Sequence, residues 1–493
     1  MEQKNAWKKY DESDIQKLEE LAANYITFIS ECKTERECAK YAIKAAEERG
    51  YINLDEAVKK GTTLSAGDKV WAHIHGKAVM LVQLGKKPLE EGLNLLGAHI
   101  DSPRLDIKQN PLYESNDFAL LDTHYYGGIK KYQWVTLPLA IHGVVVKKSG
   151  EVVEVVIGED PQDPVFCITD LLPHLASIQM DKKAKEVVDG EDLDILVGSR
   201  PVQIPKKDSV TGKKEDKGDV ETSEENEPET PEEKLAKLAE KEPVKALLLQ
   251  MLAQKYDIEE EDFLSAELEV VPAGRARDCG IDRSMVIGYG QDDRVCAYTS
   301  LIAQLEVDKP EKTSICLLVD KEEIGSVGAS GMESLFFENT LAEIMTLAGE
   351  TSNLSLRRAL FASNMLSSDV SAGFDPTYAS VFEAKNAAYC GKGLVFNKYT
   401  GSRGKSGSND ASAEYIAKIR SLMDNNDIAY QTAELGKVDV GGGGTIAFIP
   451  AKYGMNVIDS GISVLSMHSP WEVTSKADIY EAHKGYKAFL RDA

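Results

Sequence analysis

The stretch TSICLLVDKEEIGS, residues 313–326, carries the pattern that decides the fold. Its first part, residues 313–320, is an aliphatic run with the length of one buried strand. Residues 412–425 then place apolar side chains such as Tyr415 and Ile419 on one face of a helix. Strands that alternate with helices predict an α/β fold, with a mostly parallel sheet covered by helices on both faces.

The N-terminal part predicts the same mixture of elements. Within residues 1–50, Ser13-x-x-Gln16 and Thr34-x-x-Glu37 both have the form of a capping box, which predicts two helices. Two apolar runs follow, residues 77–84 and 93–99, and both are short and aliphatic enough to be buried strands.

From about Ile107 the sequence changes to short β-like runs separated by turns, such as residues 142–147 and 152–157. This change predicts a separate β-rich module. Residues 206–242 are highly charged and contain almost no large apolar side chain before Leu235. Such a segment cannot bury a core, so we expect a mobile surface loop.

Composition limits the kind of partner. The 493 residues include 81 acidic and 57 basic side chains, and the formal charge of −24 repels nucleic acid and anionic membranes. No signal peptide or membrane-spanning segment is visible in the sequence. The seven cysteines are scattered and lack CxxC spacing, which predicts reduced thiols in a cytoplasmic protein.

Imidazole and carboxylate side chains follow five apolar runs, at the strand ends where open α/β sheets collect their ligand-binding groups. In chain order these residues are His99 and Asp101, Asp292 and Asp293, Glu322 and Glu323, Asp369, and His468. Two divalent ions need one bridging carboxylate and further nitrogen or oxygen ligands. Two histidines and three acidic residues satisfy that requirement, and a second carboxylate beside a ligand, as in Glu322-Glu323, offers a general base.

Other chemistries have less support. His73-Ile74-His75 is the competing metal pair, but its alternation predicts one face of an edge strand or a loop. The sequence has no GxSxG elbow and no Gly-flanked cysteine with a nearby histidine, which argues against covalent hydrolysis. The run Gly441 to Thr445 is not followed by GK[ST], so we expect a tight turn that brings backbone close to the active site.

The order and spacing of these motifs, across nearly the whole chain, resemble the aspartyl aminopeptidase and aminopeptidase I family of dinuclear zinc exopeptidases. The motifs are GAHIDSPRLD, PHLA, the DD pair, DKEEIGS, SSDVSAGFDP, GGGGTI and SMHSPWE. The resemblance implies a catalytic α/β domain, residues 1–106 and 285–493, interrupted by a β-rich dimerisation domain, residues 107–284. It also implies a homo-oligomer, a dodecamer built from dimers.

The resemblance implies two divalent ions per subunit, zinc first, with manganese and cobalt as alternatives. The implied ligands are His99, Asp292 and Asp369 for one ion, and Glu323 and His468 for the other, with Asp292 as the bridge. In the same way, Glu322 becomes the general base and Asp101 the residue that orients His99.

Short peptides with a free N-terminus are the implied substrates. The aspartyl branch usually has Asn after the bridging Asp, where this chain has Asp293, and a second His after PHLA, where this chain has Ile178. Residues 397–410 resemble the general aminopeptidase branch. These features favour neutral or hydrophobic N-terminal residues at least as much as Asp or Glu, although the cations in that segment favour acidic side chains.

Two further functions stay open on the sequence alone. The same metal cluster serves carboxypeptidases and N-deacylases, because one dinuclear centre hydrolyses several kinds of amide. A non-catalytic assembly protein could also keep this fold, although every expected ligand and the base Glu322 are present.

Overall fold

The computed structural model describes residues 4–203 and 231–493, and the chain forms two compact units. The main unit comprises Met1–Arg104, Tyr126–Gln133 and Val271–Ala493, and the inserted unit comprises Leu105–Tyr125 and Trp134–Val270. The second boundary therefore lies at residue 270 and not at residue 284. The reason is that β11 (Arg277–Cys279) and β12 (Met285–Gly288) pair in a sheet of the main unit.

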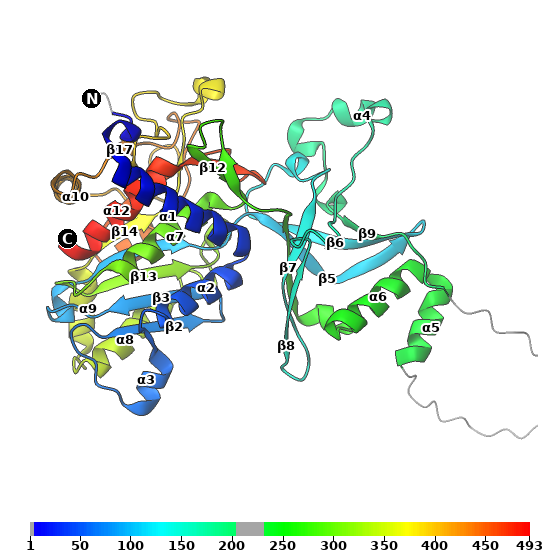
Figure 1. Ribbon diagram of the computed structural model, residues 1–493, viewed down its shortest axis with the longest axis horizontal. Helices are drawn as coiled ribbons and strands as arrows, with labels where there is room; N and C mark the ends of the chain where they lie inside the picture. Colours follow the sequence, from blue (N-terminus) through cyan, green and yellow to red (C-terminus); the bar gives the residue numbers. More distant parts are fainter. Residues whose placement is uncertain (1–3, 204–230) are drawn as a thin grey trace, which may run out of the picture. The chain divides into compact units, whose positions relative to one another are not determined.

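A nine-stranded sheet forms the centre of the main unit (Figure 1). Its strands in spatial order are β1 (Ile52–Asn53), β2 (Lys69–Ile74), β3 (Ala78–Gln83), β13 (Ser314–Val319), β4 (Asn94–His99), β14 (Asn364–Ser368), β18 (Asn456–Gly461), β16 (Leu394–Asn397) and β17 (Tyr430–Ala433). The central strands β13, β4, β14 and β18 run parallel. Strand β3 is antiparallel to β13, and β16 is antiparallel to β18.

This sheet is mixed, because the pairs β2–β3, β3–β13 and β16–β18 are antiparallel whereas its other pairs are parallel. Strands β2 and β3 form a hairpin in which Ile74 pairs with Ala78. His75 and Gly76 in the connection both have positive φ, at 53° and 67°. A connection this short joins only antiparallel strands, because parallel strands need a long crossover.

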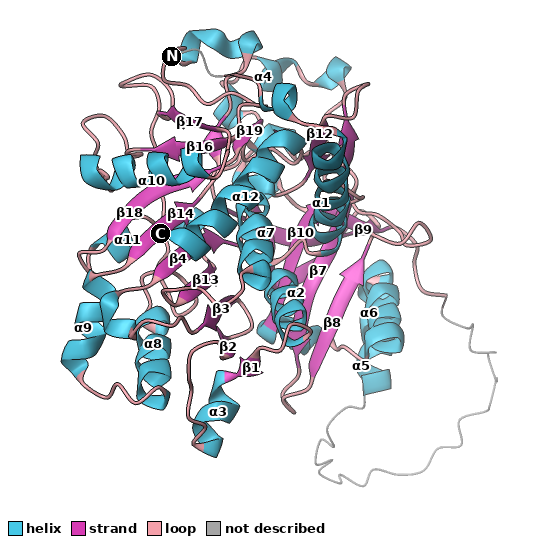
Figure 2. Ribbon diagram, turned by 60° about the vertical axis from the view of Figure 1, so that its left-hand side comes forward, coloured by secondary structure: helices cyan, strands magenta, loops and turns pink. Residues whose placement is uncertain are grey.

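Helices cover both faces of the sheet, and each face buries its own apolar cluster (Figure 2). One face is covered by α1 (Glu12–Glu31), α2 (Glu35–Glu47), α7 (Gln291–Glu306), α10 (Ala413–Asn425) and α12 (Lys476–Asp492). The other carries α3 (Leu54–Lys60), α8 (Phe336–Leu347), α9 (Asn353–Phe361) and α11 (Phe448–Ala451). Leu18, Leu21 and Tyr25 show the reason for this arrangement, because their helical spacing puts all three on the buried side of α1.

Of the two capping boxes predicted for the N-terminal helices, the structure confirms one. Thr34 accepts a hydrogen bond from the Glu37 N–H at 3.2 Å, and Glu37 accepts one from the Thr34 N–H at 3.0 Å, so the second capping box is confirmed. The first is wrong, because α1 is capped by Asp11, whose Oδ1 accepts the Asp14 N–H at 2.9 Å. Asp is as strong an N-cap as Ser, and here it lies earlier in the chain.

The inserted unit is built mainly from a six-stranded sheet and one long helix. The strands in spatial order are β8 (Val152–Ile157), β7 (Leu139–Val146), β10 (Ala266–Pro272), β5 (Arg104–Ser115), β6 (Phe118–Tyr126) and β9 (Ile195–Gly198). Helix α6 (Pro243–Tyr256) and this sheet line a cavity of about 500 Å³ whose lining is mostly aliphatic. None of the three groups of possible metal ligands found among the described residues includes a lining residue of this cavity.

Most of the predicted charged loop, residues 206–242, lies outside the described residues. Its last part is not a loop, since Pro231–Lys241 forms helix α5. In this helix Leu235 and Leu238 are partly buried and Ala239 is buried, three apolar residues at helical spacing. The apolar content that begins at Leu235 is therefore enough to hold a helix.

A five-stranded sheet completes the main unit, in the order β11, β12, β20 (Glu472–Ser475), β19 (Ser463–Leu465) and β15 (Ser371–Ala372). The antiparallel pair β12 and β20 sets Glu472 opposite Gly288. The seven cysteines all lie in described parts of the chain, and each is a free thiol. Over the same ranges, no helix combines the length and apolar character needed to cross a bilayer.

Candidate metal centre

The side chains that the sequence selected meet at the carboxyl ends of the central parallel strands. His99 is the last residue of β4, Asp369 follows β14, and Glu322 and Glu323 lie in a short 3-10 helix (Glu322–Ile324) after β13. Asp292 lies at the start of α7, and His468 lies between β19 and β20. Adjacent parallel strands end at one edge of a sheet, which is why segments far apart in sequence meet here.

Three overlapping groups of side chains have ligand atoms within 4.8 Å of one another. The groups are His99, Asp292 and Asp369; Asp292, Glu323 and His468; and His99, Glu322 and Glu323. The first two share Asp292, whose Oδ1 lies 3.3 Å from His99 Nε2 and whose Oδ2 lies 3.1 Å from His468 Nε2. One carboxylate thus faces two imidazoles, one through each oxygen.

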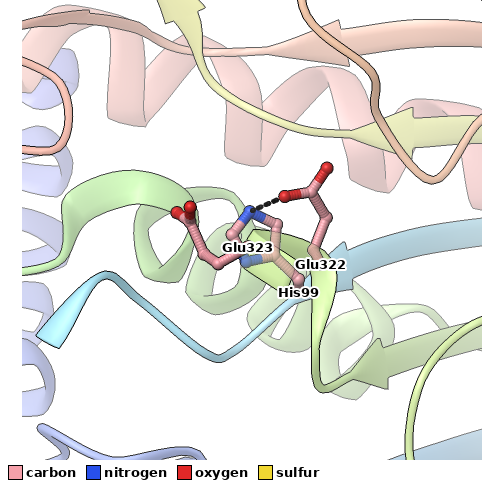
Figure 3. Close-up of side chains that lie close together, drawn as sticks. All are labelled: His99, Glu322 and Glu323. Atoms are coloured by element: carbon pink, nitrogen blue, oxygen red, sulfur yellow. Dashed lines mark ion pairs between the residues drawn. The ribbon is translucent and has the colours of Figure 1, made fainter. Parts of the chain in front are cut away.

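Glu322 and Glu323 point in different directions, with their carboxylates on opposite sides of His99 (Figure 3). Glu322 Oε2 is 3.9 Å from His99 Nε2, whereas Glu323 Oε1 is 3.6 Å from His468 Nε2. Asp101 holds the backbone of both residues, because its two oxygens accept the Glu322 and Glu323 N–H groups, each at 3.2 Å. Neighbours in sequence therefore face different parts of the cluster.

Asp101 also sets the orientation of His99. His99 Nδ1 lies 3.2 Å from Asp101 Oδ1 and 3.0 Å from the Asp101 backbone oxygen, both of which accept a hydrogen bond. Donation from Nδ1 leaves Nε2 as the lone-pair nitrogen that faces Asp292. Burial raises the pKa of Asp101, whereas its hydrogen bond with His99 and the one from Tyr126, at 2.8 Å, lower it. The lowering is the larger effect, so the pKa of Asp101 lies below its ordinary value.

The loop that carries Asp292 depends on a glycine and on Glu472. Gly290 has a φ of 68°, and a Cβ there would lie 1.5 Å from the guanidinium of Arg294, so only glycine fits. Glu472 is buried, and its two oxygens accept the Asp292 N–H at 3.0 Å and the His468 N–H at 2.7 Å. Glu472 thereby joins two segments of the cluster through their backbones.

Sequence reasoning missed Glu472 and Tyr126. Glu472 stands in the SMHSPWE motif, four residues after His468, and that proximity is the signal that could have found it. Tyr126 lies in a segment that returns to the main unit from within the β-rich part of the sequence. Nothing in its local sequence distinguishes it from other β-strand tyrosines.

The chemistry of the cluster fits divalent cations. Among the described residues of the cluster, Glu323 Oε1 is a buried oxygen without a hydrogen-bond partner. Burial raises the pKa of Glu323 and of Asp369 well above the ordinary values, and neighbouring carboxylates raise both further. Clustered buried carboxylates need compensating positive charge, and carboxylate and imidazole are ligands that zinc, manganese and cobalt accept.

A cavity of about 590 Å³ opens onto this cluster, and Asp292, Glu322, Glu323, Asp369 and His468 line it. Gly442, Gly443, Gly444 and Thr445 line it as well, which confirms the prediction that this run brings backbone to the site. A Cβ at Gly442, where φ is 124°, would lie 2.1 Å from the Gly401 oxygen. This close approach of two backbone segments requires glycine.

His73 and His75 are not part of the cluster. His73 lies on β2, where its Nδ1 accepts the Gly76 N–H at 3.2 Å. Neither histidine belongs to any group of possible metal ligands found among the described residues. The competing metal pair is therefore not supported.

Comparisons with known proteins agree with the site. The aminopeptidase I zinc metalloprotease (M18) family matches residues 28–490. A probable M18 family aminopeptidase 1 of Clostridium acetobutylicum is 58% identical over 491 residues, covering 100% of this chain and 98% of that one. The protein of the same description from Thermotoga maritima is 41% identical over 491 residues, covering 99% of both chains.

Solved structures give the same result. The crystal structure of an M18 family aminopeptidase from Thermotoga maritima covers 100% of both chains, with a TM-score of 0.88 and 40% identity. Aminopeptidase I from Clostridium acetobutylicum also covers 100% of both chains, with a TM-score of 0.87 and 55% identity. The protein is thus a metal-dependent hydrolase of peptide bonds, and it belongs to the aminopeptidase I zinc metalloprotease (M18) family.

Proposed function

We propose that this chain is a dinuclear zinc aminopeptidase that releases single residues from the N-termini of short peptides. The observation that carries the proposal is the sharing of Asp292 between two groups of ligand atoms. His99 and Asp369 complete the site of one ion, and Glu323 and His468 complete the site of the other. Glu322 belongs to neither of these two groups, which leaves it available as a base.

Glu322 is proposed to transfer a proton from the attacking water to the leaving amine. Bound zinc supplies a polarised carbonyl and an acidified water. The Glu322 carboxylate takes a proton from the attacking water as the water oxygen bonds to the carbonyl carbon, and it then gives that proton to the leaving amine nitrogen. Burial raises the pKa of Glu322 to about 7, with His99 opposing and Asp292 adding to the rise.

Blocking the substrate amine tests the proposed activity. Metal-stripped protein is reconstituted separately with zinc, manganese and cobalt, and is assayed on leucine p-nitroanilide and its N-acetyl form. We expect hydrolysis of the free-amine substrate and a loss of roughly 100-fold or more on acetylation, because an amine site rejects an analogue that cannot pair with it. Release of acetate from the N-acetyl form would support an N-deacylase, and cleavage of N-blocked peptides only at a free C-terminus would support a carboxypeptidase. Metal content near zero would support a non-catalytic protein.

We predict that neutral or hydrophobic N-terminal residues are cleaved at least as well as Asp or Glu. Lys398 and Lys405 do not line the cavity, and both pair with Asp410, at 2.6 Å and 3.0 Å. Arg403 is exposed and does not line it either. Their attraction for an acidic side chain is therefore weakened. A panel of aminoacyl p-nitroanilides measures the preference, and exclusive cleavage after Asp and Glu contradicts it.

We also propose a closed homo-oligomer, a dodecamer built from dimers, in which the inserted unit makes subunit contacts. Five exposed apolar side chains in one segment of this unit support the proposal: Leu171, Leu172, Leu175, Ile178 and Met180. Ile178 and Met180 are 79% and 77% exposed, and such a patch marks an interaction surface. A yeast aminopeptidase 1 of the same fold, 20% identical with a TM-score of 0.71, is described as a dodecamer.

Sedimentation velocity of the metal-loaded protein tests this assembly. The expected species has about twelve times the mass of one chain. Leu175→Glu with Ile178→Glu is expected to shift the protein to smaller species, because charges on a buried contact are costly. Lys182→Glu, an exposed change in the same segment, is the control and leaves assembly intact. A wild-type species with the mass of two chains at micromolar concentration excludes the dodecamer.

The proposed setting of this activity is the cytoplasm. The seven free thiols and the charge of −24 support it, and they fit a protein that acts on peptides and does not bind nucleic acid or membranes.

A further inference from the structure

The cavity at the metal centre contains a carboxylate that the mechanism does not use. Asp459 lies on β18, is 3% exposed and lines this cavity. It is the lining carboxylate that belongs to none of the three ligand groups found in the described part of the chain. Its place therefore calls for a role other than metal binding.

The two oxygens of Asp459 have different surroundings. Oδ1 accepts a hydrogen bond from the Thr445 hydroxyl at 2.5 Å. Oδ2 is buried and has no hydrogen-bond partner among the described residues. No lysine or arginine is among the described residues that line the cavity. A buried carboxylate oxygen of this kind is costly unless a donor, best a cation, pairs with it.

We propose that Asp459 binds the free α-ammonium group of the substrate. The inference rests on the proposed aminopeptidase activity and adds the residue that makes the enzyme an exopeptidase. Asp459 lines the same cavity as Glu322 and Asp292, so it faces the space where the substrate reacts. An ammonium group donates up to three hydrogen bonds, and Oδ2 accepts one of them.

The rest of the cavity favours the α-ammonium group over a basic side chain as the partner. Val370, Leu435, Phe448 and Met467 line the same space and offer apolar surface to a neutral N-terminal residue. With such a substrate the α-amine is the cation near the scissile bond. Burial raises the pKa of Asp459 to about 7, with the Thr445 hydrogen bond opposing, and an ammonium partner would favour the ionised form.

Substrates that differ only in the amine test the assignment. The zinc-loaded enzyme is assayed on leucine p-nitroanilide and on its α-hydroxy analogue, in which a hydroxyl replaces the amine. For Asp459→Asn, we expect kcat/KM for the amine substrate to fall by about 30-fold or more, mainly through KM, because one partner of a buried charge pair is lost. The analogue should change less than about three-fold, because it carries no charge for Asp459 to pair with.

Controls separate this role from a structural one. Asp424→Asn, at an exposed position of α10, should leave both substrates unchanged. Zinc content of Asp459→Asn should equal that of the wild type. If this variant does not fold, Asp459→Ser serves, since its hydroxyl also accepts a hydrogen bond without carrying charge.

Each other outcome has a distinct meaning. Equal losses on both substrates, or no loss on either, overturn the assignment of Asp459. Lysine p-nitroanilide is assayed beside these two substrates, and a loss confined to it assigns Asp459 to side-chain recognition and also overturns the proposal. Absence of activity in the zinc-loaded wild type contradicts the proposed function itself.

Discussion

Glu322→Gln should lower kcat by roughly two to four orders of magnitude and leave both zinc ions bound. The amide keeps the size of the side chain but cannot accept the water proton. Glu322 lies outside both groups that share Asp292, so its loss removes no proposed ligand. Steady-state kinetics on leucine p-nitroanilide, with metal content measured on the same sample, checks both parts of the expectation.

Glu323→Gln is the matched control, because it makes the same chemical change at the adjacent position. Glu323 faces His468 and Asp292, so this variant should lose zinc as well as activity. Near-normal turnover of Glu322→Gln with two ions bound would show that the base is another group. Loss of zinc from Glu322→Gln would instead make Glu322 a ligand.

Asp292→Asn should deplete zinc from both positions and abolish turnover. The amide has one weakly basic oxygen in place of two charged ones, whereas the site uses Asp292 Oδ1 on the side of His99 and Oδ2 on the side of His468. Loss of even a residue that only supports a ligand typically costs about 10- to 100-fold in metal affinity, and a shared ligand should cost more. Zinc content after dialysis against a weak chelator measures the effect.

Asp293→Asn makes the same change one residue later and is the control. The resemblance noted in the sequence places Asn at this position in the aspartyl branch, so Asn should be tolerated. Asp293 Oδ2 accepts a long hydrogen bond, 3.4 Å, from the His99 N–H, which an amide oxygen can also accept. Equal zinc content in the two variants would remove Asp292 from the role of bridge.

The metal-binding candidates were predictable because each stands directly after an apolar run. His99 ends β4, Glu323 and Asp369 follow β13 and β14, and the ends of parallel strands meet whatever lies between them in sequence. Glu472 and Asp459 were not predictable in the same way. Glu472 reaches Asp292 through the register of β12 with β20, and Asp459 faces the cavity through its place on β18 beside β14. The register between two strands that are distant in sequence cannot be predicted from the residues of either strand alone.

In the fold, too, local features were predictable from the sequence and features that depend on distant segments were not. The strand at residues 152–157 and the helix predicted at 412–425 follow from local periodicity, and both are confirmed, the helix as Ala413–Asn425. The antiparallel directions of β3 and β16 depend on how their connections close, so local periodicity does not predict which strands run antiparallel. The return of residues 126–133 to the main unit was missed because a β-like run does not reveal which sheet it joins.

Anomalous diffraction from crystals of the zinc-loaded protein, recorded on both sides of the zinc absorption edge, tests the two-ion centre most directly. The account predicts two anomalous peaks per chain, about 3.5–4 Å apart, on either side of the Asp292 carboxylate. His99 and Asp369 should approach one peak, and Glu323 and His468 the other. A single peak at full zinc loading, or two peaks that do not share Asp292, would contradict it.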